Sequence, residues 1–225
     1  MITPFWHAVL TVLRKDIRIE LRSRELVSTM ALFAALSVFV FSFALELERV
    51  LLRAAAGGIL WVTVCFALIL GLNRSLAAER EQGGMDALLL APINRSALYV
   101  GKLLSNALFG MIVGTALLPL FALLYNVNLV DVRLLGVVAL GTLGLAAVGT
   151  LLAAMTVQTR AREALLPIVM LPAALPMLIL VVRITNAVLN GQPDAQWVGL
   201  IPLALLLDAL YTGLCYVLFP FVLED

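Results

Sequence analysis

Six long apolar stretches, separated by short polar segments, dominate the pattern of this sequence. Each is close to the length of about 20 residues that a helix needs to cross a hydrocarbon core about 30 Å thick. The stretches cover residues 26–45, 54–72, 103–127, 134–157, 164–182 and 198–223. The short alternating strands of a membrane β-barrel are absent from the sequence. We therefore predict an all-α membrane protein in which residues 26–225 form one domain of six transmembrane helices.

The first 25 residues show the pattern of an amphipathic helix. Apolar side chains recur at helical spacing at Trp6, Leu10, Leu13, Ile17 and Leu21. Basic side chains gather on another side of the same helix, at Arg14, Lys15, Arg18 and Arg22. Residues 1–25 are therefore predicted to lie in the membrane interface, with the basic side near lipid phosphates. The alternative is a solvated helix end.

Composition supports the membrane assignment and removes other classes of protein. Of the 225 residues, 63% are hydrophobic and 13% charged, with a mean hydropathy of +1.09. Soluble domains are nearer half apolar and a quarter charged, so a soluble enzyme and a disordered chain are both excluded. A formal net charge of +1 shows no excess of basic residues of the kind that nucleic-acid binding requires. Cys65, Cys215 and the single histidine, His7, are too scattered for a metal site.

The distribution of Lys and Arg predicts the orientation in the membrane. Eleven of the 15 basic residues lie before the first span or in the second and fourth connections, and four lie in the odd-numbered connections. Because basic residues accumulate on the cytoplasmic side, both termini are expected in the cytoplasm.

The second connection, residues 73–102, contains an unusual short apolar segment. The charged residues Glu79, Arg80 and Glu81 should continue the second span into the cytoplasm, and Gly83 can end that helix. Met85–Leu90 is then too short to cross a bilayer and too apolar to lie bare in water, and Pro92 ends it. Such a helix suits insertion into a groove of a soluble partner. A re-entrant or interfacial loop without a partner is the alternative.

The run EREQGGMDALLLAPINRSALYVGKLL, residues 79–104, resembles the signature of ABC-2 type permeases. The wider sequence resembles the haem exporter protein B family, the membrane subunits of the cytochrome c maturation ABC transporter. This second resemblance is carried by KDIRIELRSRE (15–25), GLNRSLAAERE (71–81) and REALLPIVMLPAALPMLIL (162–180). The doubled glycine at 83–84 departs from the expected pattern and affects the angle of the short helix.

The resemblance implies a transport subunit, not an enzyme, in the bacterial inner membrane. A separate cytoplasmic ATPase subunit would bind ATP, and two copies of the chain would serve two ATPase subunits. Other implied partners are a tryptophan-rich haem-handling membrane protein, a small accessory membrane subunit and a periplasmic haem chaperone. Haem would be the substrate, not a cofactor of this chain. The sequence agrees in having no G-x-x-x-x-G-K-[ST] phosphate loop. A general ABC-2 exporter of a drug, lipid or polysaccharide is the alternative.

On this interpretation the coupling residues are those of the charged helix end and the short helix, namely Glu79, Arg80, Glu81, Gly83, Met85, Leu88, Leu89 and Pro92. Pro167, Pro172 and Pro176 of the fifth span form either a hinge or static kinks, because each removes a backbone donor. Asp208 in the sixth span is either a proton or ligand site or a hydrogen-bonded packing residue. The small-residue pattern of Gly110 and Gly114 serves internal packing or a dimer contact.

Overall fold

The computed structural model describes residues 4–44, 49–81, 94–125, 132–156 and 162–222 of the chain, and all elements assigned within them are helices. These helices are α1 (Phe5–Ser23), α2 (Glu25–Ala44), α3 (Arg49–Glu81), α5 (Arg95–Tyr125), α6 (Val132–Thr156), α7 (Arg162–Leu189), α8 (Asp194–Trp197) and α9 (Leu200–Val222). Six of the helical segments in these ranges are long and apolar enough to cross a membrane. The predicted all-α fold with six spans is therefore confirmed.

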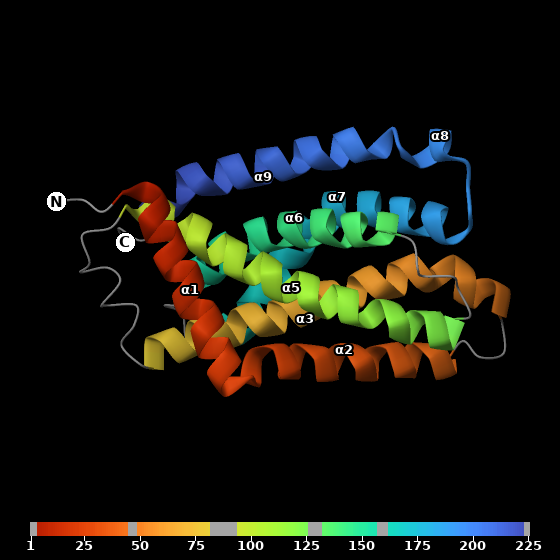
Figure 1. Cartoon of the computed structure of the whole chain (residues 1–225), viewed down its shortest axis with the longest axis horizontal. Helices are drawn as coiled ribbons and strands as arrows, with labels where there is room; N and C mark the ends of the chain where they lie inside the picture. Colours follow the sequence, from red (N-terminus) through yellow and green to blue (C-terminus); the bar gives the residue numbers. More distant parts are fainter. Residues whose placement is uncertain (1–3, 45–48, 82–93, 126–131, 157–161, 223–225) are drawn as a thin grey trace.

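The long helices lie side by side and run in both directions along the bundle; they are α2, α3, α5, α6, α7 and α9. Helix α1 crosses one end of them (Figure 1). We call this end the α1 end. It also holds the start of α2, the last turns of α3, the start of α5 and the end of α9. The opposite end holds the short helix α8 and is called the α8 end. Connections far apart in sequence are thus gathered at two separate ends.

The centre of the bundle is made by α3 and α6, which are the most buried of the spans. Small residues let neighbouring helices come close here. A Cβ on Gly110 would lie 2.7 Å from Leu68 Cδ2, and one on Gly114 would lie 2.8 Å from Val138 Cγ1. Both glycines of α5 therefore serve internal packing, against α3 and α6, as one of the two sequence interpretations expected.

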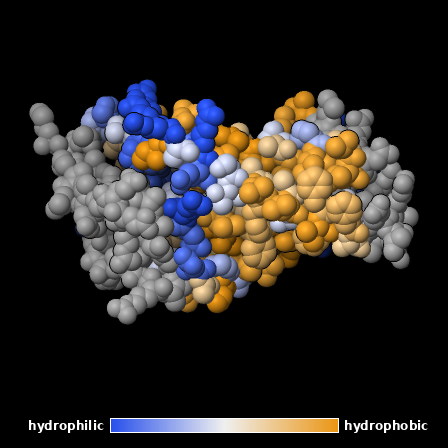
Figure 2. Space-filling view, turned by 90° about the horizontal axis from the view of Figure 1, so that it is seen from below, coloured by the Kyte–Doolittle hydropathy of each residue, from blue (hydrophilic) through white to orange (hydrophobic). Residues whose placement is uncertain are grey.

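The outer surface combines a broad apolar region with a polar edge. Figure 2 shows hydrophilic residues gathered beside a hydrophobic belt that extends toward the other end of the molecule. The outermost helices α2 and α9 expose large apolar side chains, among them Leu32, Leu36, Val40, Leu206, Leu210 and Val217. In water such a surface would be costly, whereas hydrocarbon solvates it without penalty.

Candidate coupling site at the α1 end

The structure brings the two boundaries of the predicted coupling segment to the α1 end (Figure 1). Helix α3 continues through Glu79, Arg80 and Glu81, as the sequence predicted. Helix α5 begins at Arg95, where Asn94 Oδ1 accepts a hydrogen bond of 2.9 Å from the backbone N–H of Ser96 and so caps the helix. Gly83, Met85, Leu88, Leu89 and Pro92 lie outside the described residues.

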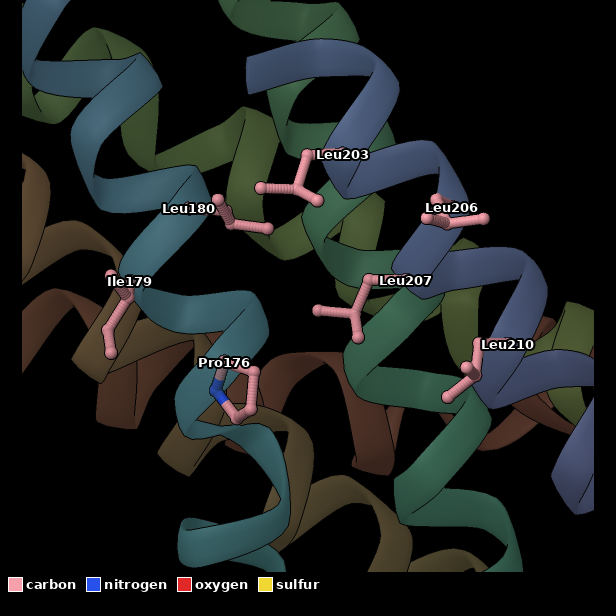
Figure 3. Close-up of a pocket in the computed structure, with 7 residues that line it drawn as sticks. All are labelled: Pro176, Ile179, Leu180, Leu203, Leu206, Leu207 and Leu210. Carbon is pink, nitrogen blue, oxygen red and sulfur yellow. The ribbon is translucent and has the colours of Figure 1, made fainter.

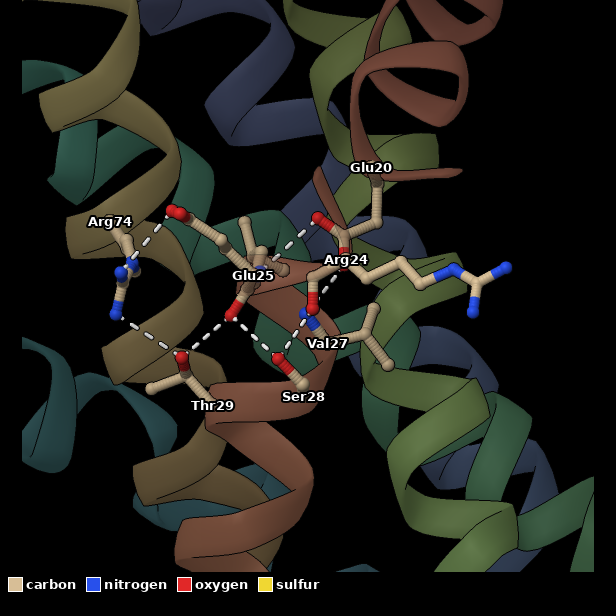
Figure 4. Close-up of polar contacts among 8 residues, drawn as sticks. Glu20, Arg24, Glu25, Val27, Ser28, Thr29 and Arg74 are labelled. Carbon is tan, nitrogen blue, oxygen red and sulfur yellow. Dashed lines mark hydrogen bonds and ion pairs between the residues drawn. The ribbon is translucent and has the colours of Figure 1, made fainter. Parts of the chain in front are cut away.

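The turn between α1 and α2 is a tight elbow built from charged residues. Arg24 ends α1 in the left-handed conformation, with φ 54°, and its backbone N–H donates to Glu20 O at 2.7 Å. The Glu20 carboxylate accepts from the backbone N–H groups of Leu26 at 3.2 Å and Val27 at 2.8 Å (Figure 4). Because the first amides of a helix have no partner within the helix, Glu20 stabilises the start of α2 and fixes its angle to α1.

The start of α2 is tied to the last part of α3 by an exposed ion pair. Arg74 Nη2 lies 3.3 Å from Glu25 Oε2, and Arg74 Nη1 donates to Thr29 Oγ1 at 3.2 Å (Figure 4). Glu25 and Arg74 belong to two of the stretches that carry the resemblance, 15–25 and 71–81. The structure therefore brings these two stretches together at the α1 end.

A buried ion pair joins α1 to α5. Lys102 Nζ lies 3.0 Å from Asp16 Oδ2 and 3.1 Å from Oδ1, and Lys15 Nζ lies 3.3 Å from Oδ1. The side chains of Asp16 and Lys102 are only 8% and 7% exposed. At such burial a charge is tolerated only when it is paired, so the two residues hold each other in place.

Close packing beside this pair depends on the glycine that precedes Lys102. A Cβ on Gly101 would lie 2.7 Å from Val12 Cβ and 3.2 Å from Val9 O. Val9, Val12 and Asp16 thus form the side of α1 that faces α5. The Gly-Lys step that resembles the permease signature has a structural role: glycine admits α1, and lysine binds its aspartate.

This contact was missed by the sequence analysis. Asp16 was not singled out, because two acids among four basic residues are typical of an exposed amphipathic helix. The signal that could have found it is the one-turn spacing of Val9, Val12 and Asp16, which defines a third side of α1 between the apolar and basic sides.

The three prolines, Pro167, Pro172 and Pro176, all lie inside α7 and differ in exposure. Pro172 and Pro176 are exposed and Pro167 is half-buried. Pro176 lines an entirely apolar groove of about 350 Å³ between α7 and α9, together with Ile179, Leu180, Leu203, Leu206, Leu207 and Leu210 (Figure 3). Near the groove, the Tyr211 hydroxyl donates to Ala173 O at 2.7 Å and joins α9 to the proline-containing part of α7. A hinge at these prolines stays a prediction.

Asp208 is packed inside the bundle against a glycine. Asp208 is 4% exposed, and a Cβ on Gly144 would clash with Asp208 Oδ1 and lie 3.0 Å from Met177 Cε. Gly144 therefore leaves the space that the carboxyl occupies. The expected hydrogen bond is not found, because neither carboxyl oxygen has a partner among the described residues. A proton or ligand role for Asp208 stays a prediction.

Comparison with known proteins assigns the chain to a family. The model of the CcmB protein family matches residues 7–222, which is nearly the whole chain. The chain belongs to the CcmB family. The match covers α1 from its third residue, all six spans and both stretches that meet through Glu25 and Arg74.

Curated relatives of this CcmB family member agree. Heme exporter protein B of Rhodobacter capsulatus is 30% identical over 210 residues, covering 86% of this chain and 94% of that protein. Heme exporter protein B of Pseudomonas aeruginosa is 29% identical over 186 residues, covering 82% of this chain and 83% of that protein. The protein of the same name from Bradyrhizobium diazoefficiens is 28% identical over 185 residues, covering 82% and 83%.

Proposed function

We propose that this CcmB-family protein is the haem-export permease subunit of an ABC transporter for cytochrome c biogenesis. ATP hydrolysis on a separate cytoplasmic subunit would drive either haem export or release of a haem-loaded periplasmic chaperone. The family match supports the transport role. The observation that carries the coupling role is the convergence of α1, α2, α3 and α5 at the end where residues 82–93 connect α3 to α5.

The contacts at the α1 end support transmission of force from that connection. A push on residues 82–93 acts on the last turns of α3 and the first turns of α5. Arg74 passes displacement of α3 to Glu25 of α2, and Lys102 passes displacement of α5 to Asp16 of α1. Because packed interiors deform little, helices tied in this way move together instead of bending separately.

The charge distribution supports a cytoplasmic α1 end. Helix α1, the elbow, the end of α3 and the start of α5 carry most of the basic residues, whereas the α8 end carries Arg133 and Arg183 among those with described side chains. By the positive-inside rule the α1 end then faces the cytoplasm, where an ATPase subunit binds. The further partners in this proposal are the tryptophan-rich membrane protein, the small accessory subunit and a second copy of the chain.

The proposal is tested by placing charges on the short apolar segment. In Leu88→Asp/Leu89→Asp, two carboxylates would be buried without partners at the contact with the ATPase, so we expect loss of the ATPase subunit on co-purification. Maturation of cytochrome c should fall in parallel. The matched control is Gln192→Asp/Gln196→Asp, which adds the same charges to exposed positions at the α8 end.

Two outcomes would contradict parts of the proposal. Normal retention of the ATPase and normal cytochrome c maturation in the Leu88/Leu89 variant would contradict the coupling role. Normal maturation of cytochrome c in cells that lack the chain would instead favour a general ABC-2 exporter of another substrate.

A further inference from the structure

The two acidic residues of α1 are both occupied by internal partners. Asp16 is bound by Lys102 and Lys15, and Glu20 accepts the first backbone N–H groups of α2. The sequence of α1 holds four basic residues against these two acids. Its outward surface therefore carries a stronger positive charge than the sequence count indicates.

The remaining basic residues form one exposed row. Arg14, Arg18 and Arg22 follow one another at four-residue spacing, and all three side chains are exposed. Four-residue spacing places them on one side of the helix. Among the described residues, none of the three has an ion-pair partner. We call Arg14, Arg18 and Arg22 the arginine row.

An exposed apolar row lies next to the arginine row on the same helix. Trp6, Leu10 and Leu21 are 69%, 48% and 71% exposed. The bundle is contacted by a third side of α1, with Val12 and Asp16, so these large side chains are not needed for packing within the described chain. A tryptophan at the end of such a row is typical of the boundary between hydrocarbon and headgroups.

The position of α1 sets the two rows at the edge of the membrane-spanning bundle. Helix α1 lies across the end of the long helices (Figure 1), with Phe5 stacked edge-on against Tyr216 of α9 at 6.4 Å and its other end joined to α2. A hydrophilic zone borders the hydrophobic belt of the molecule (Figure 2). An apolar row facing hydrocarbon and a basic row at headgroup level are what a bilayer surface accommodates.

We propose that the arginine row binds the headgroups of anionic phospholipids. Positive charge on the row complements the lipid phosphates, and the adjacent apolar row enters the acyl region of the same leaflet. A soluble protein partner would leave the apolar row without hydrocarbon contact, so lipid is favoured. The buried Asp16–Lys102 pair holds the row in a fixed orientation, which lowers the entropy lost on binding.

The test measures lipid preference of the purified full-length chain, without ATPase or haem. Native mass spectrometry compares bound phosphatidylglycerol and phosphatidylcholine from an equimolar mixture. Each basic residue near an anionic surface contributes about a fivefold gain in binding, so three contribute about 100-fold. In Arg14→Gln/Arg18→Gln/Arg22→Gln we expect the preference for phosphatidylglycerol to fall by up to this factor.

Two control variants make the outcome decisive. Arg14→Lys/Arg18→Lys/Arg22→Lys keeps the charge and should keep the preference, and Arg183→Gln removes an exposed charge near the α8 end and should also keep it. An unchanged preference in the glutamine variant, or no preference in the wild type, would overturn the proposal. If the glutamine variant keeps its lipid preference but no longer retains a co-expressed ATPase subunit, the arginine row binds a protein partner. This result would also overturn the proposal.

Discussion

The α1 end and the α8 end differ in their buried polar contacts. At the α1 end these contacts include an ion pair, Asp16–Lys102, beside the neutral hydrogen bond from the Tyr99 hydroxyl to Ala147 O. Toward the α8 end the buried tie is neutral, with Trp61 Nε1 donating to Thr185 Oγ1 at 2.8 Å between α3 and α7. The α8 end also has an ion pair, Arg133–Asp194 at 2.7 Å, but both of its side chains are more than half exposed.

The two kinds of buried contact differ in how much free energy it costs to separate them. Separating a neutral hydrogen bond leaves a buried polar group unsatisfied, at a cost of about 1–3 kcal/mol. A buried ion pair is costly to separate and joins its helices more firmly against displacement. The α1 end is the place where we propose that force enters, and it is also where the structure carries the firmer tie.

The largest expected effect comes from breaking the buried ion pair. Lys102→Met leaves the Asp16 carboxylate buried beside Lys15 alone, so we expect a loss of about 3–5 kcal/mol in the free energy of unfolding. Denaturant unfolding in detergent micelles measures it. The double variant Asp16→Leu/Lys102→Met should recover most of the loss, since apolar residues need no partner. A double variant as unstable as the single one would show that the charge pairing is not the cause.

A smaller loss is expected from the neutral tie near the α8 end. Thr185→Val leaves the buried Trp61 N–H without an acceptor, which should cost about 1–3 kcal/mol in the same measurement. Thr185→Ser keeps a hydroxyl group at this position and should retain most of the stability. If valine is tolerated as well as serine, the hydrogen bond contributes little and the comparison of the two ends would rest on packing alone.

The smallest effect is expected at the exposed ion pair between α2 and α3. Arg74→Gln removes the pair with Glu25, yet exposed pairs contribute at most about 1 kcal/mol, so stability should barely change. Arg133→Gln at the α8 end is the matched variant and should behave alike. A loss for Arg74→Gln as large as that for Lys102→Met would show that the elbow contributes more to stability than its exposure indicates.

Much of the fold was predictable because hydropathy reports membrane spans directly. The six spans were found and the charged extension of α3 was expected, but α5 and α7 are also longer than their apolar runs. Helix α5 begins at Arg95, eight residues before the predicted start, and α7 continues to Leu189, seven residues past the predicted end. In both extensions polar side chains find partners inside the protein: Tyr99 donates to Ala147 O, and Thr185 accepts from Trp61. A hydropathy scale scores such residues as polar whether or not they are buried. The span predicted from it is therefore shorter than the helix.

The candidate site was predictable only in part. The charged end of α3 follows from a local pattern and was expected. The ion pair between Asp16 and Lys102 could not be found in this way, because its strength depends on burial between helices that are distant in sequence. The sequence shows an aspartate among basic residues, and only the packing of α1 on α5 shows that it is internal.

The same ion pair has a consequence for the order of events during synthesis. Asp16 and Lys102 are 86 residues apart in the chain. At a synthesis rate of about 5–20 residues per second, Lys102 is made roughly 4–17 s after Asp16. Helix α1 therefore leaves the ribosome well before the residue that neutralises its buried carboxylate. Its final position on α5 is reached only after the third span has been inserted, which makes the first helix of the chain one of the later ones to settle.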